Sequence, residues 1–238
     1  MIFNITGQTF GGQCRNGDLV GVANIIEHLR KKHQDETIQF YMAPDSVQSS
    51  EHCQKFLGWL QDNTTFFAKE QSDNTLAWKK VNVWDYRGIC GDMVRIDNPL
   101  KSEAKVCVFP LFDAPYNNYR NWDKELYDNV LRMCRDRYRD LKKVICISNK
   151  NYLNDLDTEG FEISTDFMDN INHILTSAAF IGGDTGTSHF CSVLKDGPVE
   201  KTYLYSGRGL LHTIPFYVLE GQGRLIRFWG DFEGTTWQ

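Results

Sequence analysis

A strand–turn–helix pattern near residue 180 constrains the fold of this chain more than any other feature. The apolar run Ala178–Ile181 suits a buried central strand, which Gly182 and Gly183 then interrupt. Asp184 and Thr185 are residue types that begin helices, and the following apolar face comprises Phe190, Val193 and Leu194. A helix that begins here presents unpaired N–H groups and a positive dipole end, which favour an anion such as phosphate. A plain strand–turn–helix packed on glycines fits the local pattern equally well.

The first hundred residues contain a strand–helix–strand pattern. Ile2–Ile5 reads as a short strand, a glycine-containing loop follows, and Asp18 opens a helix. Its apolar positions recur at helical spacing: Leu19, Val22, Ile25, Ile26 and Leu29. Thr37–Met42 then reads as a second strand. This order predicts a βαβ unit with parallel strands.

A second alternation of strands and helices follows Asp97–Lys105, a polar, proline-containing segment that predicts a linker. Its predicted elements are the strands Val106–Pro110 and Lys143–Ser148, the helices Asp123–Tyr138 and Asp166–Ser177, and a strand at Thr202–Tyr205. Two such alternations predict an α/β fold of two Rossmann-like domains, residues 1–100 and 101–238, that face a cleft. Ligands are expected at the carboxyl ends of the strands.

Bulk composition limits the function classes. A chain of 238 residues with 41% hydrophobic content can bury a sizeable core, and its net charge of −5 gives no general attraction to nucleic acid or anionic membranes. No run of 18 apolar residues predicts a membrane span, and the N-terminus does not read as a signal peptide. The seven cysteines are scattered without a Cys-x-x-Cys pair, which predicts reduced buried thiols, a cytoplasmic location and no structural zinc.

Several motifs resemble those of the ADP-heptose:lipopolysaccharide heptosyltransferase family, whose members have the GT-B fold. Gly183–His189 resembles the family's Asp-Thr-Gly-x-x-His, and Arg120-Asn-Trp-Asp123 resembles its Lys-x-Trp-Pro. Gly17-Asp18 resembles the Gly-Asp that opens the family's N-terminal domain. The chain is shorter than typical members, and residues 43–105 match no part of the family's pattern.

The resemblance implies a role for each matching residue. Asp18 would be the general base that accepts the proton of an acceptor hydroxyl, although an aspartate at a helix start is also a common cap. Arg120 would bind the leaving diphosphate, and Asp184 would contact sugar hydroxyls. The turn and the first helical residues would hold the donor: Thr185, Gly186, Thr187, Ser188 and His189. A lone arginine near a helix start is usually a solvated surface residue, Asp184 could be a helix cap, and His189 could merely pack.

Further loop residues are candidate contacts for the acceptor or the nucleotide. They are Gly12, Arg15, Asn16, Gly17, Tyr116 and Arg208. Ordinary turns explain these positions as well. The GT-B design uses arginine and a helix dipole in place of a divalent metal, so the resemblance implies no metal and no cofactor beyond the nucleotide sugar.

The sequence therefore predicts a glycosyltransferase that moves a sugar from a nucleotide-diphosphate sugar to an acceptor hydroxyl, with inversion. The family's acceptor is a lipopolysaccharide core. A different acceptor would be a hydroxymethylated base in bacteriophage DNA, for which Arg15, Arg208 and other scattered cations would supply a basic groove. Two further hypotheses are a non-catalytic nucleotide-sugar binding protein and a nucleotide-sugar epimerase. The nucleotide, the sugar and the oligomeric state stay open.

Overall fold

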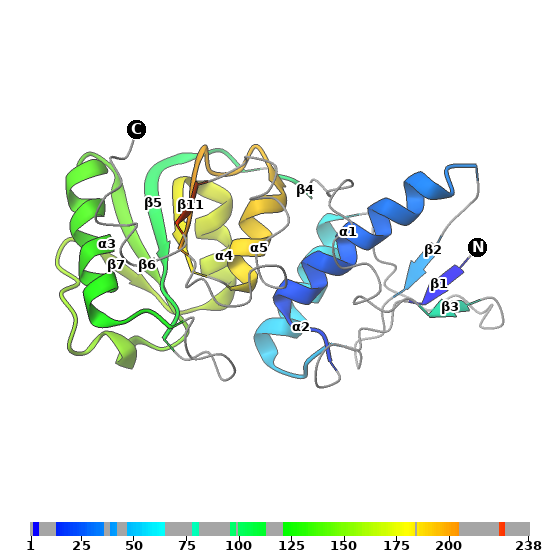
Figure 1. The fold of residues 1–238 in the computed structure, drawn as a ribbon, viewed down its shortest axis with the longest axis horizontal. Helices are drawn as coiled ribbons and strands as arrows, with labels where there is room; N and C mark the ends of the chain where they lie inside the picture. Colours follow the sequence, from blue (N-terminus) through cyan, green and yellow to red (C-terminus); the bar gives the residue numbers. More distant parts are fainter. Residues whose placement is uncertain are drawn as a thin grey trace. The chain divides into compact units, whose positions relative to one another are not determined.

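The structure is a computed structural model that describes residues 2–4, 13–35, 39–41, 47–64, 78–80, 96–98, 100–112, 121–183, 185–204 and 224–226. The chain divides into two compact units, Met1–Ile96 and Asp97–Gln238. Both units combine parallel strands with helices, as Figure 1 shows. The acceptor-side and donor-side roles of the two predicted domains stay predictions.

The first unit contains a parallel three-stranded sheet. Strand β1 (Ile2–Asn4) lies between β2 (Gln39–Tyr41) and β3 (Trp78–Lys80). Helix α1 (Asn16–Lys32) lies between β1 and β2 in the chain, so the predicted βαβ order is confirmed. The sequence also predicts strands at Thr64–Ala68 and Val81–Tyr86, and apart from Thr64 these residues lie outside the described residues.

Helices α1 and α2 (Glu51–Asn63) pack against each other through apolar side chains. The buried side chains of α1 recur at the helical spacing seen in the sequence and include Leu19, Val22, Ala23, Ile26 and Leu29. Those of α2 are Cys53, Phe56, Leu57 and Leu60. The segments that precede the two helices also pair, because Cys14 and Val47 form a parallel bridge and the Gln48 amide donates to the Cys14 carbonyl at 2.8 Å. The two helices therefore begin side by side.

The second unit is built on a six-stranded sheet in which every pair of neighbours is parallel. Its spatial order is β11-β10-β8-β5-β6-β7. The bounds are β5 Glu103–Phe109, β6 Lys142–Cys146, β7 Glu162–Ser164, β8 Ser177–Gly182, β10 Glu200–Leu204 and β11 Arg224–Ile226. Renumbered from β5 along the chain, this is the 3-2-1-4-5-6 order of a Rossmann fold. The order reverses between β5 and β8, which is where such folds bind ligands.

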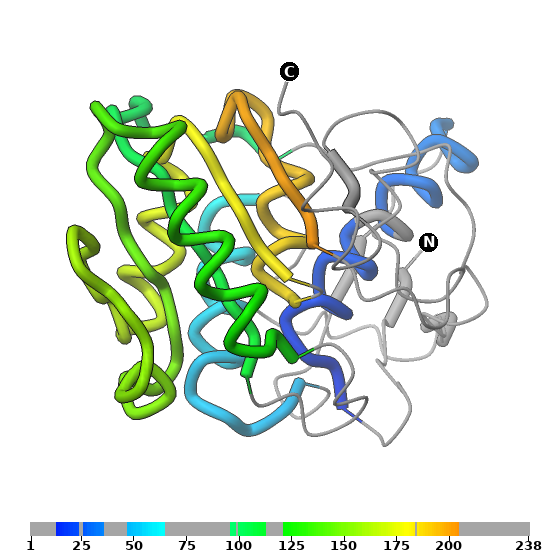
Figure 2. Tube along the Cα trace, turned by 60° about the vertical axis from the view of Figure 1, so that its left-hand side comes forward, coloured from blue at the N-terminus to red at the C-terminus, as the bar shows by residue number. Residues whose placement is uncertain are grey.

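Helices cover both faces of this sheet (Figures 1 and 2). Helix α3 (Lys124–Arg137) lies on one face, and α4 (Phe167–Thr176) and α5 (Gly186–Val193) lie on the other. Alternate β5 side chains serve the two layers: Val106 and Val108 join the α3 core, whereas Lys105 reaches His173 on α4. A short 3-10 helix (Lys150–Leu153) lies between β6 and β7 in the chain.

The predicted linker Asp97–Lys105 is too long by three residues. Strand β5 already begins at Glu103, and Lys105 is buried within it because its ammonium group has polar partners. Asn98 anchors the segment that remains, since its side chain donates to the carbonyls of Leu175 at 2.6 Å and Asp196 at 3.2 Å. Two short strands, β4 (Ile96–Asp97) and β9 (Leu194–Lys195), also pair here.

The cysteines of the described residues are buried and carry free thiols. This agrees with the reduced state predicted from their scatter. None of the described helices combines the length and the apolar character that a membrane crossing requires.

Candidate active site

The turn after β8 lies at the point where the strand order of the second unit reverses. β8 ends at Gly182, whose neighbours in the sheet are Phe109 of β5 and Tyr203 of β10. The Gly183 amide then donates to the Phe109 carbonyl at 3.2 Å, which extends the β5–β8 pairing by one step. Because all these strands are parallel, their carboxyl ends bring the turn to the edge of the sheet at which Rossmann folds bind ligands.

Neither glycine of the turn leaves room for a side chain, because other atoms lie close to both. A Cβ atom on Gly182 would lie 2.5 Å from Phe180 Cζ and 2.6 Å from Ser188 Oγ. A Cβ atom on Gly183 would lie 2.9 Å from Trp122 Nε1. The lack of a side chain at these two glycines therefore lets the protein's own aromatic rings and a serine come close to the backbone.

Helix α5 begins at the turn with a cluster of hydroxyl groups. Thr185 is the N-cap, and its Oγ1 accepts from the Ser188 amide at 3.3 Å and lies 2.7 Å from Thr187 Oγ1. The Ser188 hydroxyl donates to the Gly183 carbonyl at 2.5 Å, and Ser188 is fully buried. By helical geometry the amides of Gly186 and Thr187 have no acceptor within the helix, so they can bind an anion. His189 lies one turn into the helix and is half-buried.

The Asp18 carboxylate lies within the first turn of α1 and does not cap the helix in the expected way. The helix begins two residues earlier, at Asn16, and its N-cap is Arg15. Asp18 Oδ2 accepts from the Arg15 backbone amide at 3.0 Å, as the third residue of a capping box does. This contact holds one carboxylate oxygen at the start of α1.

The paired starts of α1 and α2 bring further polar groups near Asp18. Burial, followed by the charge of Asp18, raises the pKa of the Cys14 thiol to about 12. Burial also raises the pKa of Cys53, against the opposing effects of hydrogen bonds and the Arg15 charge. His52, at the start of α2, has its pKa lowered by burial and by Arg15. Helical spacing in the sequence predicts Cys53 on the inward face of a helix, as observed, but residues 43–105 match no motif of the family, so the sequence offered no functional signal for His52 or Cys53.

The predicted site residues form two groups within the described chain. Arg15, Asn16, Gly17 and Asp18 lie together at the start of α1, and residues 185–189 lie together at the start of α5. Five others lie outside the described residues: Gly12, Tyr116, Arg120, Asp184 and Arg208. The functional roles of all the predicted site residues, inside and outside the described chain, stay predictions.

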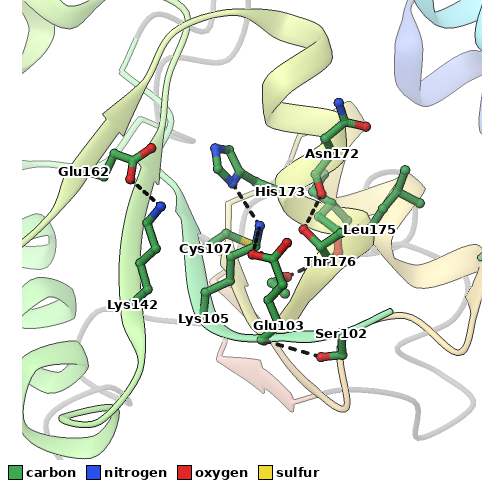
Figure 3. Close-up of polar contacts among 12 residues, drawn as sticks. Ser102, Glu103, Lys105, Cys107, Lys142, Glu162, Asn172, His173, Leu175 and Thr176 are labelled. Atoms are coloured by element: carbon green, nitrogen blue, oxygen red, sulfur yellow. Dashed lines mark hydrogen bonds and ion pairs between the residues drawn. The ribbon is translucent and has the colours of Figure 1, made fainter. Parts of the chain in front are cut away.

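A polar cluster occupies the opposite, amino-terminal edge of the six-stranded sheet (Figure 3). The ammonium group of the buried Lys105 donates to His173 Nδ1 at 3.2 Å and lies 3.2 Å from a Glu103 carboxylate oxygen. Lys142, the β6 partner of Lys105, forms an ion pair of 2.6 Å with Glu162 on β7. The cluster joins α4 to the strand β5, far along the strands from the turn at Gly183.

The half-buried His173 is expected to make the stability of the fold depend on pH. Its pKa is lowered by burial and then by the charges of Lys105 and Lys142, against the opposing charges of Glu162 and Asp169. The unfolded chain therefore binds this proton more readily, so the stabilising contribution is present above the ordinary pKa near 6.5 and is lost as pH falls through the folded value. Urea unfolding between pH 7 and pH 5 should show a smaller loss of unfolding free energy in His173→Gln than in the wild type.

Glutamine keeps an acceptor for Lys105 without titrating in this range, so His173→Gln isolates the proton from the hydrogen bond. Lys105→Met is a second comparison, because it removes a charge that lowers the pKa of His173 and should also flatten the pH dependence. If the unfolding free energies of the wild type and of His173→Gln fell equally between pH 7 and pH 5, protonation of His173 would not be the cause of the pH dependence.

The segment Asp155-Leu-Asp157 has the Asp-x-Asp spacing of some metal sites. Asp157 uses its carboxylate to accept from the Glu159 amide at 3.0 Å and to bind Arg135 at 3.0 Å, and these contacts lower its pKa. Among the described residues, no group of three or more His, Cys, Asp or Glu side chains is arranged to hold a metal ion.

Two solved structures resemble the whole chain. The E. coli ADP-heptose lps heptosyltransferase II has a TM-score of 0.54 and 13% identity, over 99% of this chain and 94% of that chain. The E. coli heptosyltransferase WaaC with ADP has a TM-score of 0.50 and 10% identity, over 97% of this chain and 94% of that chain. The predicted α/β fold class and the GT-B heptosyltransferase resemblance are therefore confirmed at the level of the fold.

Sequence comparison adds little to this likeness. No family model matches the chain. The actin-binding protein wsp1 of Schizosaccharomyces pombe is 31% identical over 87 residues, which is 36% of this chain. The chain spans only 15% of the length of that protein, so the match carries no activity across to this chain.

Proposed function

We propose that the chain is a glycosyltransferase that moves a sugar from a nucleotide-diphosphate sugar to an acceptor hydroxyl. One observation carries the proposal: a hydroxyl-rich helix start lies where the strand order of a Rossmann sheet reverses, in a chain with the fold of heptosyltransferases. One of those solved structures is described with ADP and the other by ADP-heptose, so ADP-linked sugars are the first donors to test.

The donor's diphosphate would bind at the start of α5. The amides of Gly186 and Thr187 and the dipole of the helix favour the negative charge, and the Thr185 and Thr187 hydroxyls can rotate to donate to phosphate oxygens. Arg120 would add a bidentate cation on the leaving group. Asp184 would contact sugar hydroxyls, and His189 would reach the donor from the next turn. These roles are supported by the motif resemblance.

The acceptor hydroxyl would lose its proton to Asp18. In a single displacement, the acceptor oxygen forms a bond to the anomeric carbon while the bond from that carbon to the diphosphate oxygen breaks. The electron pair leaves with the nucleoside diphosphate, whose new charge is met by the donors at α5 and by Arg120. This step inverts the anomeric carbon and needs no metal or further cofactor.

A glycan or lipid hydroxyl is the acceptor class that we propose. One solved relative in fold is named for ADP-heptose and lipopolysaccharide, and neither is named for DNA. A hydroxymethylated DNA base has no comparable support. Gly12, Arg15, Asn16, Gly17, Tyr116 and Arg208 are the proposed contacts for the acceptor or the nucleotide.

A thermal-shift screen across ADP-, UDP- and GDP-sugars tests the proposal. A donor present at about one hundred times its dissociation constant should stabilise the protein by about 2.7 kcal/mol, because it binds only the folded state. We expect one nucleotide series to raise the melting temperature well above the others, with the matching free nucleoside giving a smaller shift.

A protein that no nucleoside diphosphate or nucleotide sugar stabilises would contradict the proposal. Transfer of the selected sugar is then followed with glycan and lipid acceptors. A changed nucleotide sugar in the absence of any acceptor would identify an epimerase instead, and binding without turnover would identify a non-catalytic binding protein.

A further inference from the structure

Trp122 has a buried hydrogen-bond donor that finds no acceptor among the described residues. Its side chain belongs to the core beneath α3 and only 4% of the residue is exposed. The indole Nε1–H meets no hydrogen-bond acceptor within the described part of the chain. A buried polar group without a partner costs free energy, and native structures keep few of them.

This donor faces the turn after β8. Of the atoms that a Cβ on Gly183 would meet, Trp122 Nε1 is the nearest at 2.9 Å, whereas the ring carbon Cε2 is 3.7 Å away. The polar edge of the ring is therefore the edge turned toward Gly183. Two residues later Thr185 caps α5, so the indole N–H and the helix start lie at the same turn.

The backbone around Trp122 holds this edge in place. The Trp122 amide donates to the Leu111 carbonyl at 2.6 Å, which closes the segment between β5 and α3 at its base. On the other side, Asp123 caps α3 by accepting from the Leu126 amide at 2.8 Å. The backbone of Trp122 and that of the next residue are thus both anchored. Little further conformational entropy is lost at the indole when a ligand binds there.

The polar groups at this turn share one property: each of them can donate a hydrogen bond. The first amides of α5, the hydroxyls of Thr185 and Thr187, and the Trp122 indole can all donate to an oxygen anion, and indole cannot accept. A phosphate oxygen is an acceptor that would satisfy the indole N–H, and hydrogen bonds to charged groups are stronger than neutral ones.

We propose that Trp122 is a ligand-binding residue whose Nε1–H donates to an oxygen of the nucleotide's diphosphate beside Gly183 and the start of α5. This inference rests on the proposed function, and it adds a donor from a side chain in the core to the donors of α5. The glycine at position 183 then has a second purpose, since any larger residue would fill the space beside the indole N–H.

Calorimetric titration of Trp122→Phe with ADP and with adenosine tests the inference. Phenylalanine keeps an aromatic ring and lacks the N–H, so ADP should bind roughly 10- to 100-fold more weakly, as expected for loss of one hydrogen bond to a charged group. Binding of adenosine should be unchanged, because it has no diphosphate. Trp59→Phe, on α2 in the first unit, is the matched control and should bind both ligands as the wild type does.

A purely structural role for Trp122 gives a different result. In that case Trp122→Phe would lower the melting temperature of the free protein while the stabilisation by ADP stayed the same. Replacing Trp122 by benzothienylalanine, which keeps the indole shape without its N–H, covers the case in which the phenylalanine variant does not fold. If either folded variant bound ADP as tightly as the wild type does, the role of Trp122 would be overturned, and the proposed function would still stand.

Failure of the proposed function would look different again. If the wild type bound neither ADP nor any other nucleoside diphosphate, both the proposed function and the role of Trp122 would be overturned together. If the wild type prefers another nucleoside, the same comparison is made between that diphosphate and its nucleoside.

Discussion

Replacing Asp18 by asparagine is expected to slow sugar transfer by about 100- to 10,000-fold, the usual contribution of a positioned general base. Asparagine cannot accept the acceptor's proton at neutral pH. It still offers an oxygen to the Arg15 amide, which Asp18 Oδ2 binds at 3.0 Å, so the start of α1 should be preserved. The affinity for the nucleotide sugar should change little, because the donor is proposed to bind at α5. Initial rates of transfer and calorimetric titration with the donor measure the two quantities.

Glu27→Gln is the matched control for this variant. Glu27 lies later on the same helix, where its carboxylate is 3.9 Å from the Lys31 ammonium group, and its loss removes one charge without touching the start of α1. We expect its transfer rate to equal that of the wild type. If Asp18→Asn also transfers sugar at the wild-type rate, Asp18 is only a capping residue.

Replacing Gly182 by alanine is expected to destabilise the second unit by about 1–3 kcal/mol, the usual cost of overpacking a core. The new methyl group would lie 2.5 Å from Phe180 Cζ and 2.6 Å from Ser188 Oγ. Phe180 cannot move aside easily, because it is fully buried and its ring contacts both Phe109 and Tyr203. Ser188 would lose its position against the Gly183 carbonyl, so the start of α5 should shift and nucleotide affinity should fall as well. Differential scanning calorimetry and donor titration measure both effects.

Gly58→Ala makes the same chemical change in a place with room for it. Gly58 lies within α2, and beyond the adjacent backbone of that helix a Cβ atom there would meet no atom within 4 Å. Alanine favours helix over glycine by about 0.8–1.0 kcal/mol, so this variant should be more stable than the wild type. Equal stability of Gly182→Ala and wild type would show that the turn can relax, contrary to its packing.

Local sequence patterns predicted much of this architecture. Apolar runs marked the central strands β5, β6 and β8, because strands buried on both faces of a parallel sheet are apolar along their length. Helical spacing marked α1, α3 and α4, and the hydroxyl of Thr185 marked the start of α5. These signals are carried by neighbours in the chain, so they are visible without the fold.

The expectations that failed depend on residues distant in the chain. Lys105 was assigned to a linker by its charge, yet it is buried in β5 because His173, 68 residues later, accepts its hydrogen bond. The sequence did not predict strand β7, which has only three residues and lies at the edge of the sheet. It is a strand because it pairs with β6, and a local pattern does not reveal that pairing. Asp18 was expected to open its helix, but the helix begins at Asn16 beside the start of α2.

The sequence by itself determined the α/β class, the alternation of strands and helices, and the hydroxyl-bearing residue types at the start of α5, since each is a local property of propensity, periodicity or capping. Only the tertiary structure decided the order of the strands, which brings the ends of β5 and β8 together where the order reverses. It also decided that the indole of Trp122 faces Gly183, a contact between residues 61 positions apart by their numbering. Such contacts arise from the packing of α3 against the sheet, and no pattern within a single segment can specify them.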